Sequence, residues 1–462
     1  MSFSIADLFA KHNSEKFELY EKHLNNQLVR VLKTIGYDRH YKSAVGQYLY
    51  DEDGSEYLDL LSGFGVFALG RNHPTIANAL KETLSLDLPN LVQLDVSVLS
   101  GLLAQELLKT TPENINKLFF CNSGTEAVEA AIKFARFTTK REKIVYCEHA
   151  YHGLTLGALS LNGEEIFRSG FGPLIPGCSA VPFNDLSALE QALSGKDVAA
   201  FIIEPIQGKG VNLPADNYLK EVERLCSKYG TLMVADEVQT GLGRTGKFWA
   251  VDHWGVKPDM ICMAKALSGG HVPVGAVAMT QKIMDSVYNR MDRAVVHGST
   301  FAKNNLAMAA GLATLHVLKE ENLIEKSAVI GNDIIASINA MLSKYEFLKE
   351  ARGKGMMIAI EFQSPKSLKL KAAWAMLEAA NKGLFCQMVT IPLFKEHRIL
   401  TQVAGHGMNV VKLLPPLVLT QKDRDHIVNA FEKVIADTHE IPGSIWDLGK
   451  NLASHALKGK SK

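Results

Sequence analysis

The feature that most constrains the fold is an alternation of helical stretches with short apolar runs, between about residues 75 and 320. The apolar runs are KLFFC (117–121), KIVYC (143–147), AAFIIEP (199–205), LMVADEV (232–238) and MICMAKA (260–266). Short apolar runs that alternate with helices are typical of a parallel sheet covered by helices on both faces. The pattern therefore predicts an α/β protein with a mostly parallel sheet in its main domain.

The sequence on either side of this region predicts smaller units. Residues 1–45 have a helical, amphipathic pattern, and a hairpin-like strand pair follows at 47–60 around Asp53-Gly54. Beyond residue 320, a long helix, the strand-like MMIAIEF (356–362), another helix and VVKLLPPLVL (410–419) predict an α+β domain. The helical spacing in the first segment is carried by Leu24, Leu28, Val31 and Leu32. We expect an N-terminal segment (1–75) that joins the small domain, a large domain (76–320) and a small C-terminal domain (321–462).

The composition argues against several classes of protein. Lys and Arg total 50 against 49 Asp and Glu, so the chain has no overall field that would attract nucleic acid or a charged membrane surface. The six cysteines have neither disulfide-framework nor zinc-site spacing, which indicates free thiols in a reducing compartment. Asp7 and Lys11 precede any long apolar run, and no run is long enough to span a bilayer. We expect a cytoplasmic protein without a signal peptide.

The first candidate site is the segment Cys121-Asn122-Ser123-Gly124-Thr125-Glu126, where an apolar run gives way to a helix. The free N–H groups and partial positive charge of a helix N-terminus can hold a phosphate. Gly124 permits close backbone approach, and Ser123 and Thr125 add hydroxyl donors. The same residues also form an ordinary capping box, Ser123-x-x-Glu126, which needs no ligand.

Two further candidates stand at the ends of later apolar runs. Asp236, in Asp236-Glu237-Val238-Gln239, could pair with a protonated ring nitrogen, and Gln239 could donate to a phenolate-like oxygen. Lys265 follows MICMA, and partial burial would lower its pKa and make the amine nucleophilic. Taken singly, Asp236 is equally consistent with a solvated carboxylate at a strand end, and Lys265 taken singly is better explained as a solvated surface lysine.

A glycine-rich segment, Gly241-Leu242-Gly243-Arg244-Thr245-Gly246, matches the GxGxxG pattern of dinucleotide-binding proteins. Such a fingerprint should open an apolar-periodic helix. The sequence that follows, KFWAVDHWGVKPD, is aromatic and turn-like. The context therefore argues against a dinucleotide site.

Read in order, the candidate sites form a more specific pattern than any one of them. After the helix start at 121–126 come Tyr151-His152-Gly153, Glu204-Pro205-Ile206-Gln207-Gly208, Asp236-Glu237-Val238-Gln239-Thr240-Gly241 and Lys265. This series resembles the class III (ω-type) aminotransferases, which use pyridoxal 5′-phosphate on the type I fold. The resemblance runs from LSGFGVFALGRNHP (61–74) to LLPPLVL (413–419) and is strongest to the putrescine and ornithine aminotransferase branch.

The resemblance implies a role for each of these residues. Lys265 would form a Schiff base with the cofactor and then carry a proton, and Asp236 would keep the cofactor's ring nitrogen protonated. The large domain would bind the cofactor through Ser123, Gly124, Thr125, Tyr151, His152, Glu204, Val238, Gln239 and Thr300. Within this set, Tyr151 and Val238 would lie on opposite ring faces, Gln239 would bind the phenolic oxygen, and Glu204 would lie close by. Arg352 fits a family pattern, but we assign it no role.

The resemblance also implies a homodimer. Thr300 would reach the phosphate of the neighbouring subunit, and the segment Gly63-Phe64-Gly65 would help to complete the opposite active site. The other expected partners are small-molecule amines and carbonyl compounds, with neither nucleic acid nor a membrane involved.

The chain departs from its relatives at two positions that bear on the substrate. Relatives acting on α-keto acids commonly carry glutamate in EPIQGE and an arginine shortly before the Pro-Pro pair, and the arginine grips a carboxylate. Lys209 and Lys412 stand at these positions here. An unpaired lysine attracts a carboxylate only as a point charge, without the two-pronged arginine fork. With Phe64, Phe67 and Trp249 expected near the entrance, these positions predict an ω-amine or aldehyde substrate, with a medium or long alkyl chain.

Three other functions stay open at this point. A pyridoxal-phosphate-dependent isomerase or decarboxylase would use the same residues, and a conventional ornithine or 4-aminobutyrate transaminase would differ only in its substrate. A non-catalytic phosphate- or nucleotide-binding protein would explain the helix start and GxGxxG, but not Lys265 or Asp236. Conversion of the cofactor to its pyridoxamine form by an amine donor alone would separate transfer from isomerisation.

Overall fold

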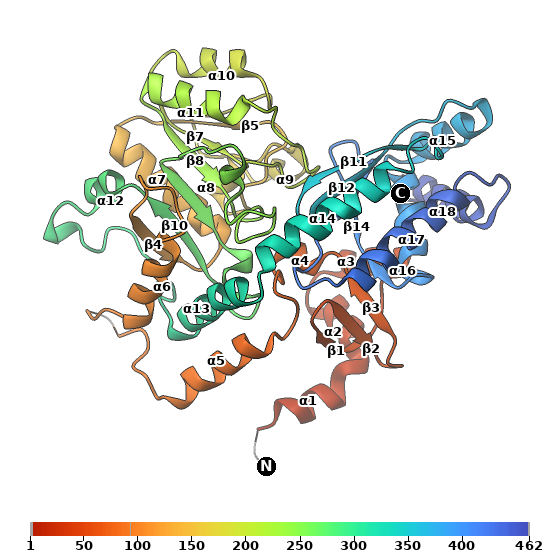
Figure 1. Cartoon of the computed structure of the whole chain (residues 1–462), viewed down its shortest axis with the longest axis horizontal. Helices are drawn as coiled ribbons and strands as arrows, with labels where there is room; N and C mark the ends of the chain where they lie inside the picture. Colours follow the sequence, from red (N-terminus) through yellow and green to blue (C-terminus); the bar gives the residue numbers. More distant parts are fainter. Residues whose placement is uncertain (1–2, 93, 461–462) are drawn as a thin grey trace.

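The largest sheet in the computed structural model, which describes residues 3–92 and 94–460, has seven strands in the order β4-β10-β9-β8-β7-β5-β6 (Figure 1). The strands are β4 (Lys117–Cys121), β5 (Lys143–Cys147), β6 (Cys178–Val181), β7 (Val198–Ile203), β8 (Leu232–Asp236), β9 (Met260–Met263) and β10 (Gly275–Met279). β10 is antiparallel to both of its neighbours, and the other pairs are parallel. The five apolar runs of the sequence form β4, β5, β7, β8 and β9, so the prediction of a mostly parallel α/β sheet is confirmed.

Two strands of this sheet were not expected from the sequence. β6 is short and only its last residue, Val181, is buried, so it lacks a continuous apolar run. β10 is fully buried, but its sequence, GAVAM, is built from small residues that carry a weak strand signal. Both are therefore strands because of their neighbours rather than their own composition.

In the described part of the chain, nine α-helices accompany the large sheet, some packed directly on its strands and others packed on those helices. They are α5 (Pro74–Ser85), α6 (Val98–Leu108), α7 (Gly124–Thr139), α8 (Leu156–Leu159), α9 (Glu165–Arg168), α10 (Leu186–Leu193), α11 (Tyr218–Tyr229), α12 (Gln281–Val287) and α13 (Asn305–Glu320). α7 contacts β4, β7, β8, β9 and β10, because its apolar face carries alanines that allow close approach. Three short 3₁₀ helices lie in the same region: η2 (Ala250–His253), η3 (Lys265–Ser268) and η4 (Met291–Arg293).

A second sheet of four antiparallel strands, β11-β12-β15-β14, lies in the C-terminal part of the chain, beyond α14 (Figure 1). Its elements are α14 (Leu323–Asn339), β11 (Leu348–Lys354), β12 (Met357–Phe362), α15 (Leu368–Ala380), α16 (Leu384–Lys395), β14 (Gln402–Ala404), β15 (Val410–Leu413), α17 (Gln421–Asp437) and α18 (Ser444–Lys460). The predicted run 410–419 is a strand only to Leu413, because Pro415 and Pro416 cannot continue the ladder.

A third sheet joins the two ends of the chain. Its strands are β1 (Tyr41–Val45), β2 (Tyr48–Asp51), β3 (Glu56–Asp59) and β13 (Ile399–Leu400). β2 and β3 form the hairpin expected around Asp53-Gly54, and β13 pairs with β3 in parallel. This pairing supports the prediction that the N-terminal segment joins the small domain, and the exact domain limits stay a prediction.

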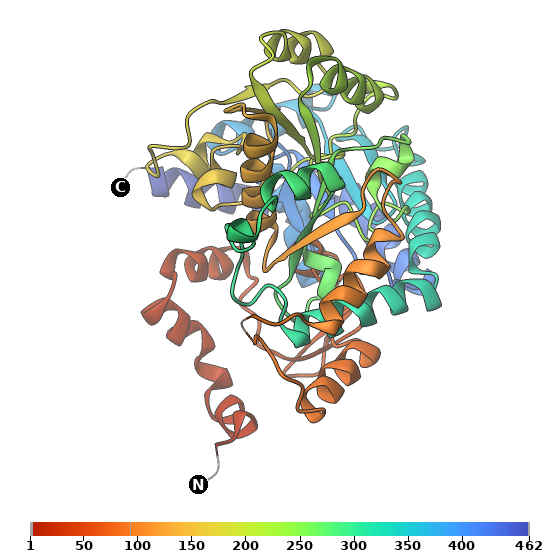
Figure 2. The ribbon, with the colours of Figure 1, turned by 90° about the vertical axis from the view of Figure 1, so that its left-hand side faces the viewer.

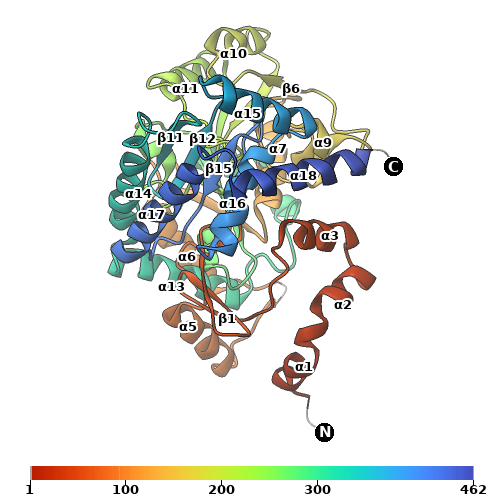
Figure 3. The ribbon, with the colours of Figure 1, turned by 90° about the vertical axis from the view of Figure 1, so that its right-hand side faces the viewer.

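The N-terminal helices differ from the expectation for residues 1–45. They are α1 (Ile5–His12), η1 (Asn13–Glu15), α2 (Lys16–His23) and α3 (Asn26–Ile35), and the helical region ends before β1. Leu24, Leu28 and Val31 are exposed and only Val29 is buried, so the predicted apolar face does not face the core. α1 extends away from the rest of the chain (Figures 2 and 3), whereas the start of α2 contacts the segment around β1 through Phe17 and His40, whose ring centres are 5.1 Å apart.

The helices and the cysteines bear on the expectations drawn from composition. Among the described residues, none of the helices has the length and apolar character required to cross a bilayer. All six cysteines are free thiols, and five of them are buried.

The contact between α14 and the β11–β12 turn allows a test of the fold. A Cβ atom at Gly331 would lie 1.9 Å from the carbonyl oxygen of Gly355, which is backbone and cannot move aside. We expect Gly331→Ala to lower the free energy of unfolding by about 1–3 kcal/mol, seen as a lower urea midpoint with an unchanged slope. Val329→Ala, on the exposed face of the same helix, should change it by less than about 0.5 kcal/mol. Equal stabilities of the two variants would contradict this packing.

Candidate active site

Strands of the large sheet that run in one direction end at a common edge, and every main candidate residue follows one of these ends. β4 belongs to this set because β10 is antiparallel to both β4 and β9. The residues at the edge are Ser123–Thr125 after β4, Tyr151 and His152 after β5, Glu204 after β7, Asp236–Gln239 at the end of β8 and Lys265 after β9. The carboxyl edge of a parallel sheet is the usual ligand-binding position in such folds.

The start of α7 has the properties of an anion site. The Ser123 hydroxyl caps the helix by accepting from the Glu126 N–H at 3.3 Å. The Glu126 carboxylate accepts from the Asn122 N–H at 2.5 Å rather than from Ser123, so only half of the predicted capping box forms. Within the described chain, the N–H groups of Gly124 and Thr125 have no acceptor, and they remain available to a phosphate.

The turn after β5 is fitted closely to this helix start. Thr125 Oγ1 accepts from the Thr155 N–H at 3.1 Å and lies 2.6 Å from Thr155 Oγ1. A Cβ atom at Gly153 would lie 2.4 Å from Thr125 Oγ1, and its φ of +120° also favours glycine. The glycine of the Tyr151-His152-Gly153 motif is therefore required by packing.

Asp236 is buried and held from two sides. His152 Nδ1 lies 2.7 Å from Asp236 Oδ2, and the Val238 N–H donates to Asp236 Oδ1 at 3.1 Å. Burial alone would lower the pKa of His152, but the hydrogen bond to Asp236 and the charges of Asp236 and Glu204 outweigh burial and raise it. The solvated-carboxylate interpretation of Asp236 is wrong, since its side chain is 4% exposed.

Glu204 is a second buried carboxylate at the same edge. It accepts from the Tyr151 N–H at 3.0 Å and from the Gly208 N–H at 2.8 Å. Burial raises its pKa, and the nearby His152 opposes part of that shift. Glu204 thus connects the loops that follow β5 and β7.

Lys265 is the first residue of η3, just after β9, and its backbone conformation is unusual. Its φ of +44° is rare for a residue other than glycine and is typical of strain held at functional sites. Burial lowers the pKa of the Lys265 amine, while the charges of Asp236 and Glu204 oppose this. Among the residues that the structure describes, none makes a hydrogen bond or ion pair with this amine. A partly desolvated, unpaired amine is suited to nucleophilic and proton-transfer chemistry.

Lys412 is inside the site and is bound to its neighbours. Its side chain is buried, and its amine donates to Gln239 Oε1 at 2.6 Å and to the carbonyl oxygen of Gly208. Burial and the nearby Lys265 lower the pKa of Lys412 to about 7. Gln239 in turn donates from Nε2 to the carbonyl oxygen of Phe64 at 3.1 Å. Both ends of the Gln239 amide are therefore fixed by the protein.

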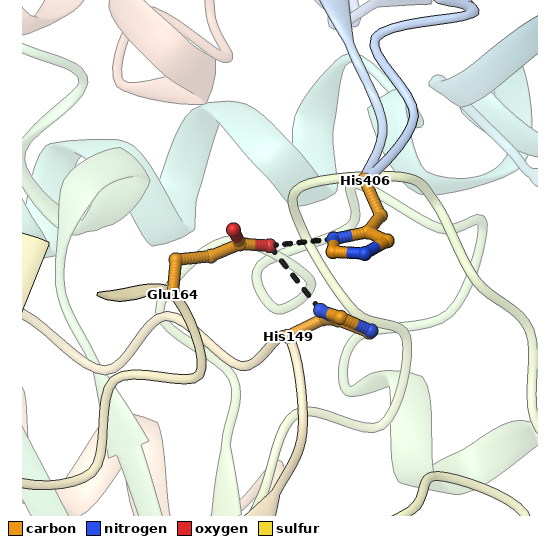
Figure 4. Close-up of side chains that lie close together, drawn as sticks. All are labelled: His149, Glu164 and His406. Atoms are coloured by element: carbon orange, nitrogen blue, oxygen red, sulfur yellow. Dashed lines mark hydrogen bonds and ion pairs between the residues drawn. The ribbon is translucent and has the colours of Figure 1, made fainter. Parts of the chain in front are cut away.

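Lys209 is not unpaired, contrary to the expectation from the sequence. Its amine lies 3.0 Å from Glu164 Oε1, the oxygen that also faces His149 and His406 (Figure 4). Burial alone would raise the pKa of Glu164, but Lys209 and His406 outweigh it and lower it. Lys209 and Lys412 therefore have separate partners.

The remaining predicted residues lie at or near the same edge. Tyr151 is part-exposed, with its ring edge-to-face with Phe167 at 5.6 Å, and Val238 lies against the backbone of Gly124. Phe64 is 55% exposed. Thr300 is exposed, while its neighbour Ser299 accepts from Asn122 Nδ2 at 2.6 Å. The role of Thr300 at the phosphate of a neighbouring subunit stays a prediction.

Two expected entrance residues behave differently from each other. The expectation for Trp249 is wrong, because its indole is fully buried and donates to the carbonyl oxygen of Thr110 at 2.9 Å. Phe67 is part-exposed, and the Arg71 guanidinium lies 4.1 Å from its ring centre. The sequence alone does not distinguish an aromatic loop residue that lines an opening from one that is buried in the core.

The glycine-rich loop 241–246 and Arg352 have structural partners. Arg244 is buried and donates to the carbonyl oxygens of Met356 and Pro415, and the short 3₁₀ helix η2, not an α-helix, follows the loop. Arg352 donates to the carbonyl oxygens of Val211 and Gly210 and pairs with Glu350 and Glu361. Both arginines join loops of the large sheet to the C-terminal part of the chain.

The sequence did not point to Glu164, His149 or His406. His149 precedes the Tyr151 motif by two residues, which was the available signal, but Glu164 and His406 lie in loops far apart in the sequence. Only the fold brings them to one place.

Comparison with known proteins agrees with this geometry. Residues 34–435 match the family described as Aminotransferase class-III. The chain is 34% identical over 452 residues to aminotransferase PigE of Serratia sp. (strain ATCC 39006), covering 91% of this chain and 53% of that protein. The chain thus spans about half the length of this curated relative.

Solved structures with the same fold are also similar. The ornithine aminotransferase of Toxoplasma gondii ME49 superposes with a TM-score of 0.81 at 28% identity, covering 94% of this chain and 99% of that one. A PLP-bound amine transaminase from an uncultivated Pseudomonas species gives a TM-score of 0.73 at 27% identity, covering 86% and 94%. The chain belongs to the class III aminotransferases, with the type I pyridoxal-phosphate fold.

Members of this family depend on pyridoxal 5′-phosphate, and the residues of this chain fit it. The unpaired N–H groups at the start of α7 suit a phosphate, and Asp236, held by His152, suits a protonated ring nitrogen. The negative charges of Asp236 and Glu204 raise the pKa of the unpaired Lys265 amine, against the effect of burial, so the three groups are close together.

Lys265 provides the most direct test of this site. We expect Lys265→Ala to fold and bind the cofactor but to lose at least about three orders of magnitude in turnover, because nucleophile and proton carrier are lost together. Borohydride reduction of the wild-type protein, followed by mass spectrometry, should place the cofactor on Lys265. Lys228→Ala, which removes an exposed lysine paired with Glu190, should leave turnover unchanged. An adduct on another lysine would exclude the assignment.

Proposed function

We propose that this aminotransferase moves an amino group between an amine donor and a ketone or aldehyde, and that one substrate is an ω-amine or aldehyde without an α-carboxylate, with a medium or long alkyl chain. The observation that carries the substrate class is Lys412. Its amine is committed to Gly208 and Gln239, and Lys209 is committed to Glu164. Lys412 is therefore not free to grip a carboxylate. Lys209, whatever its partner, lacks the planar two-pronged fork of an arginine.

The comparisons alone do not decide between substrates. An ornithine aminotransferase and an amine transaminase are both among the structures similar to this chain. Phe64, whose backbone carbonyl accepts from Gln239, is half-exposed, and its apolar side chain would favour a hydrocarbon body over a charged one.

The chain's own residues would divide the work as follows. When bound, pyridoxal 5′-phosphate supplies an electron sink that stabilises negative charge on the carbon bearing the amino group. Asp236, oriented by His152, would keep the ring nitrogen protonated, and Gly124 and Thr125 would hold the phosphate. The Lys265 amine, whose pKa is lowered by burial, would accept and return a proton more readily than a solvated lysine. Gln239, fixed by Lys412 and the Phe64 carbonyl, would orient the phenolic oxygen.

The functional unit we propose is a cytoplasmic homodimer. Exposed apolar side chains gather in two segments, one leading into α6 and one around η4. They are Leu84, Leu86, Leu88, Val92, Leu94, Val96, Val98 and Leu102 in the first, and Met291, Val295, Val296 and Phe301 in the second. So much exposed apolar surface is typical of an interface, and the second segment contains Thr300. A second copy of the chain would cover both segments and receive Thr300 at its phosphate site.

A chain-length series tests the substrate class. We expect catalytic efficiency with aliphatic amines and aldehydes to rise with length, by up to about fourfold per methylene, because each buried methylene contributes about 0.8 kcal/mol. Ornithine and 4-aminobutyrate serve as carboxylated comparisons. Efficiency that is flat with chain length, together with a tenfold or greater preference for the carboxylated donors, would exclude the proposal.

A Lys412→Met variant separates the two possible roles of this lysine. If Lys412 positions Gln239, kcat should fall by a similar factor for amines and for amino acids. If Lys412 grips a carboxylate, KM should rise for ornithine and 4-aminobutyrate but stay unchanged for simple amines. The second result would exclude the proposed substrate class.

The homodimer predicts a stable assembly with an apolar interface larger than about 2,000 Å². Val96→Lys places a charge within the first apolar segment, and we expect it to shift the protein toward monomer and to reduce activity, measured by light scattering and turnover. Val329→Lys changes an exposed valine outside both segments and should have no such effect. A fully active wild-type monomer at low concentration would contradict the prediction.

A further inference from the structure

Two histidines and a glutamate from distant parts of the sequence meet beside the active-site loops (Figure 4). His149 lies between β5 and Tyr151, Glu164 precedes α9, and His406 lies in the loop that joins β14 and β15. One donor atom from each residue lies within 4.8 Å of the other two. The cluster therefore joins the C-terminal sheet to loops of the large sheet.

All of these contacts converge on a single oxygen atom. Glu164 Oε1 lies 3.2 Å from His149 Nδ1, 3.1 Å from His406 Nδ1 and 3.0 Å from Lys209 Nζ. The two imidazole rings are also close, with centres 3.7 Å apart. Both rings therefore lie side by side at one carboxylate oxygen.

Two of the three distances between the donor atoms match metal coordination, and the third is below 4.8 Å. Zinc bound to imidazole nitrogen and carboxylate oxygen has bond lengths of about 2.0–2.2 Å, so two ligand atoms of a tetrahedral site lie about 3.3 Å apart. The distances of 3.1 and 3.2 Å between the carboxylate oxygen and the two nitrogens are close to this value. Two histidines and one carboxylate also form a known zinc ligand set that leaves a fourth position open.

We propose that His149, Glu164 and His406 bind a divalent transition-metal ion of the zinc type. Lys209 would give up its contact with Glu164 when the ion binds, since both cations use the same oxygen. The carbonyl oxygen of Lys209 accepts from the Gly405 N–H at 2.9 Å, so the β14–β15 loop is already anchored beside the cluster. A bound ion would fasten this loop, which leads into the strand that carries Lys412, to the loops around Tyr151.

The site can be tested by metal binding alone, so that its failure would not bear on the aminotransferase activity. The holoenzyme is treated with a chelator, desalted and titrated with Co²⁺, and Zn²⁺ is then added as a competitor. We expect one equivalent of Co²⁺ to bind and to give tetrahedral visible absorption at wavelengths longer than those of the cofactor. One equivalent of Zn²⁺ should abolish this signal.

Variants place the signal at the cluster. His406→Gln removes a ligand that is 62% exposed and should fold normally, and Glu164→Gln removes the shared oxygen's charge; both should lose the signal. His12→Gln is the matched control, because His12 also faces a glutamate, Glu15, at 3.0 Å but without a second histidine. It should bind Co²⁺ as the wild type does.

The Lys209→Met variant removes the ammonium group that competes with the ion for Glu164. It tests the site even if the wild type binds Co²⁺ weakly. We expect this variant to bind Co²⁺ at least about tenfold more tightly than the wild type. Absence of the tetrahedral signal in both the wild type and Lys209→Met would overturn the proposal. So would a signal that persists in His406→Gln and Glu164→Gln.

Discussion

Burial of charge at the carboxyl edge of the large sheet is the constraint on which the rest of the site depends. Asp236 and Glu204 are taken out of water there, beside the amines of Lys265 and Lys412. Each buried carboxylate is balanced by hydrogen bonds, Asp236 by His152 and Glu204 by two backbone N–H groups. The same burial lowers the pKa of both lysines, so the environment that makes the carboxylates costly also activates the amines.

The parts of the fold that could be predicted are those in which local composition and final environment agree. The runs that form β5, β7, β8 and β9 are apolar because both of their faces are covered, and this pattern is visible without a structure. β10 and β6 are placed by their neighbours and carry no such pattern. For the helices before residue 36 the local pattern was clear but the environment was not. An amphipathic pattern predicts that a helix has an apolar face, but it does not predict what covers that face.

The candidate site divides in a similar way. Residues that follow strand ends, such as Asp236 and Lys265, could be found from sequence because position and chemistry coincide there. Partners contributed by loops could not be found, since the Lys209–Glu164 pair depends on how loops fold over the edge. The positions of Trp249 and Lys412 also depend on how the loops fold. Trp249 is buried in the core, and the Lys412 amine points inward to Gln239.

Residues assigned to the chemistry and residues that bear on the substrate stand on different parts of this fold. The groups assigned to chemistry stand at the ends of β8 and β9 and at the start of α7, where strand pairing and helix packing hold them in place. The groups that differ from the usual carboxylate clamp stand on the loop after β7 and on β15, and their partners are other loop residues. A lysine in place of an arginine at 412 binds acceptors that the protein already offers, the Gly208 carbonyl and Gln239. The substrate preference can therefore change at these positions without any new uncompensated charge beside Lys265.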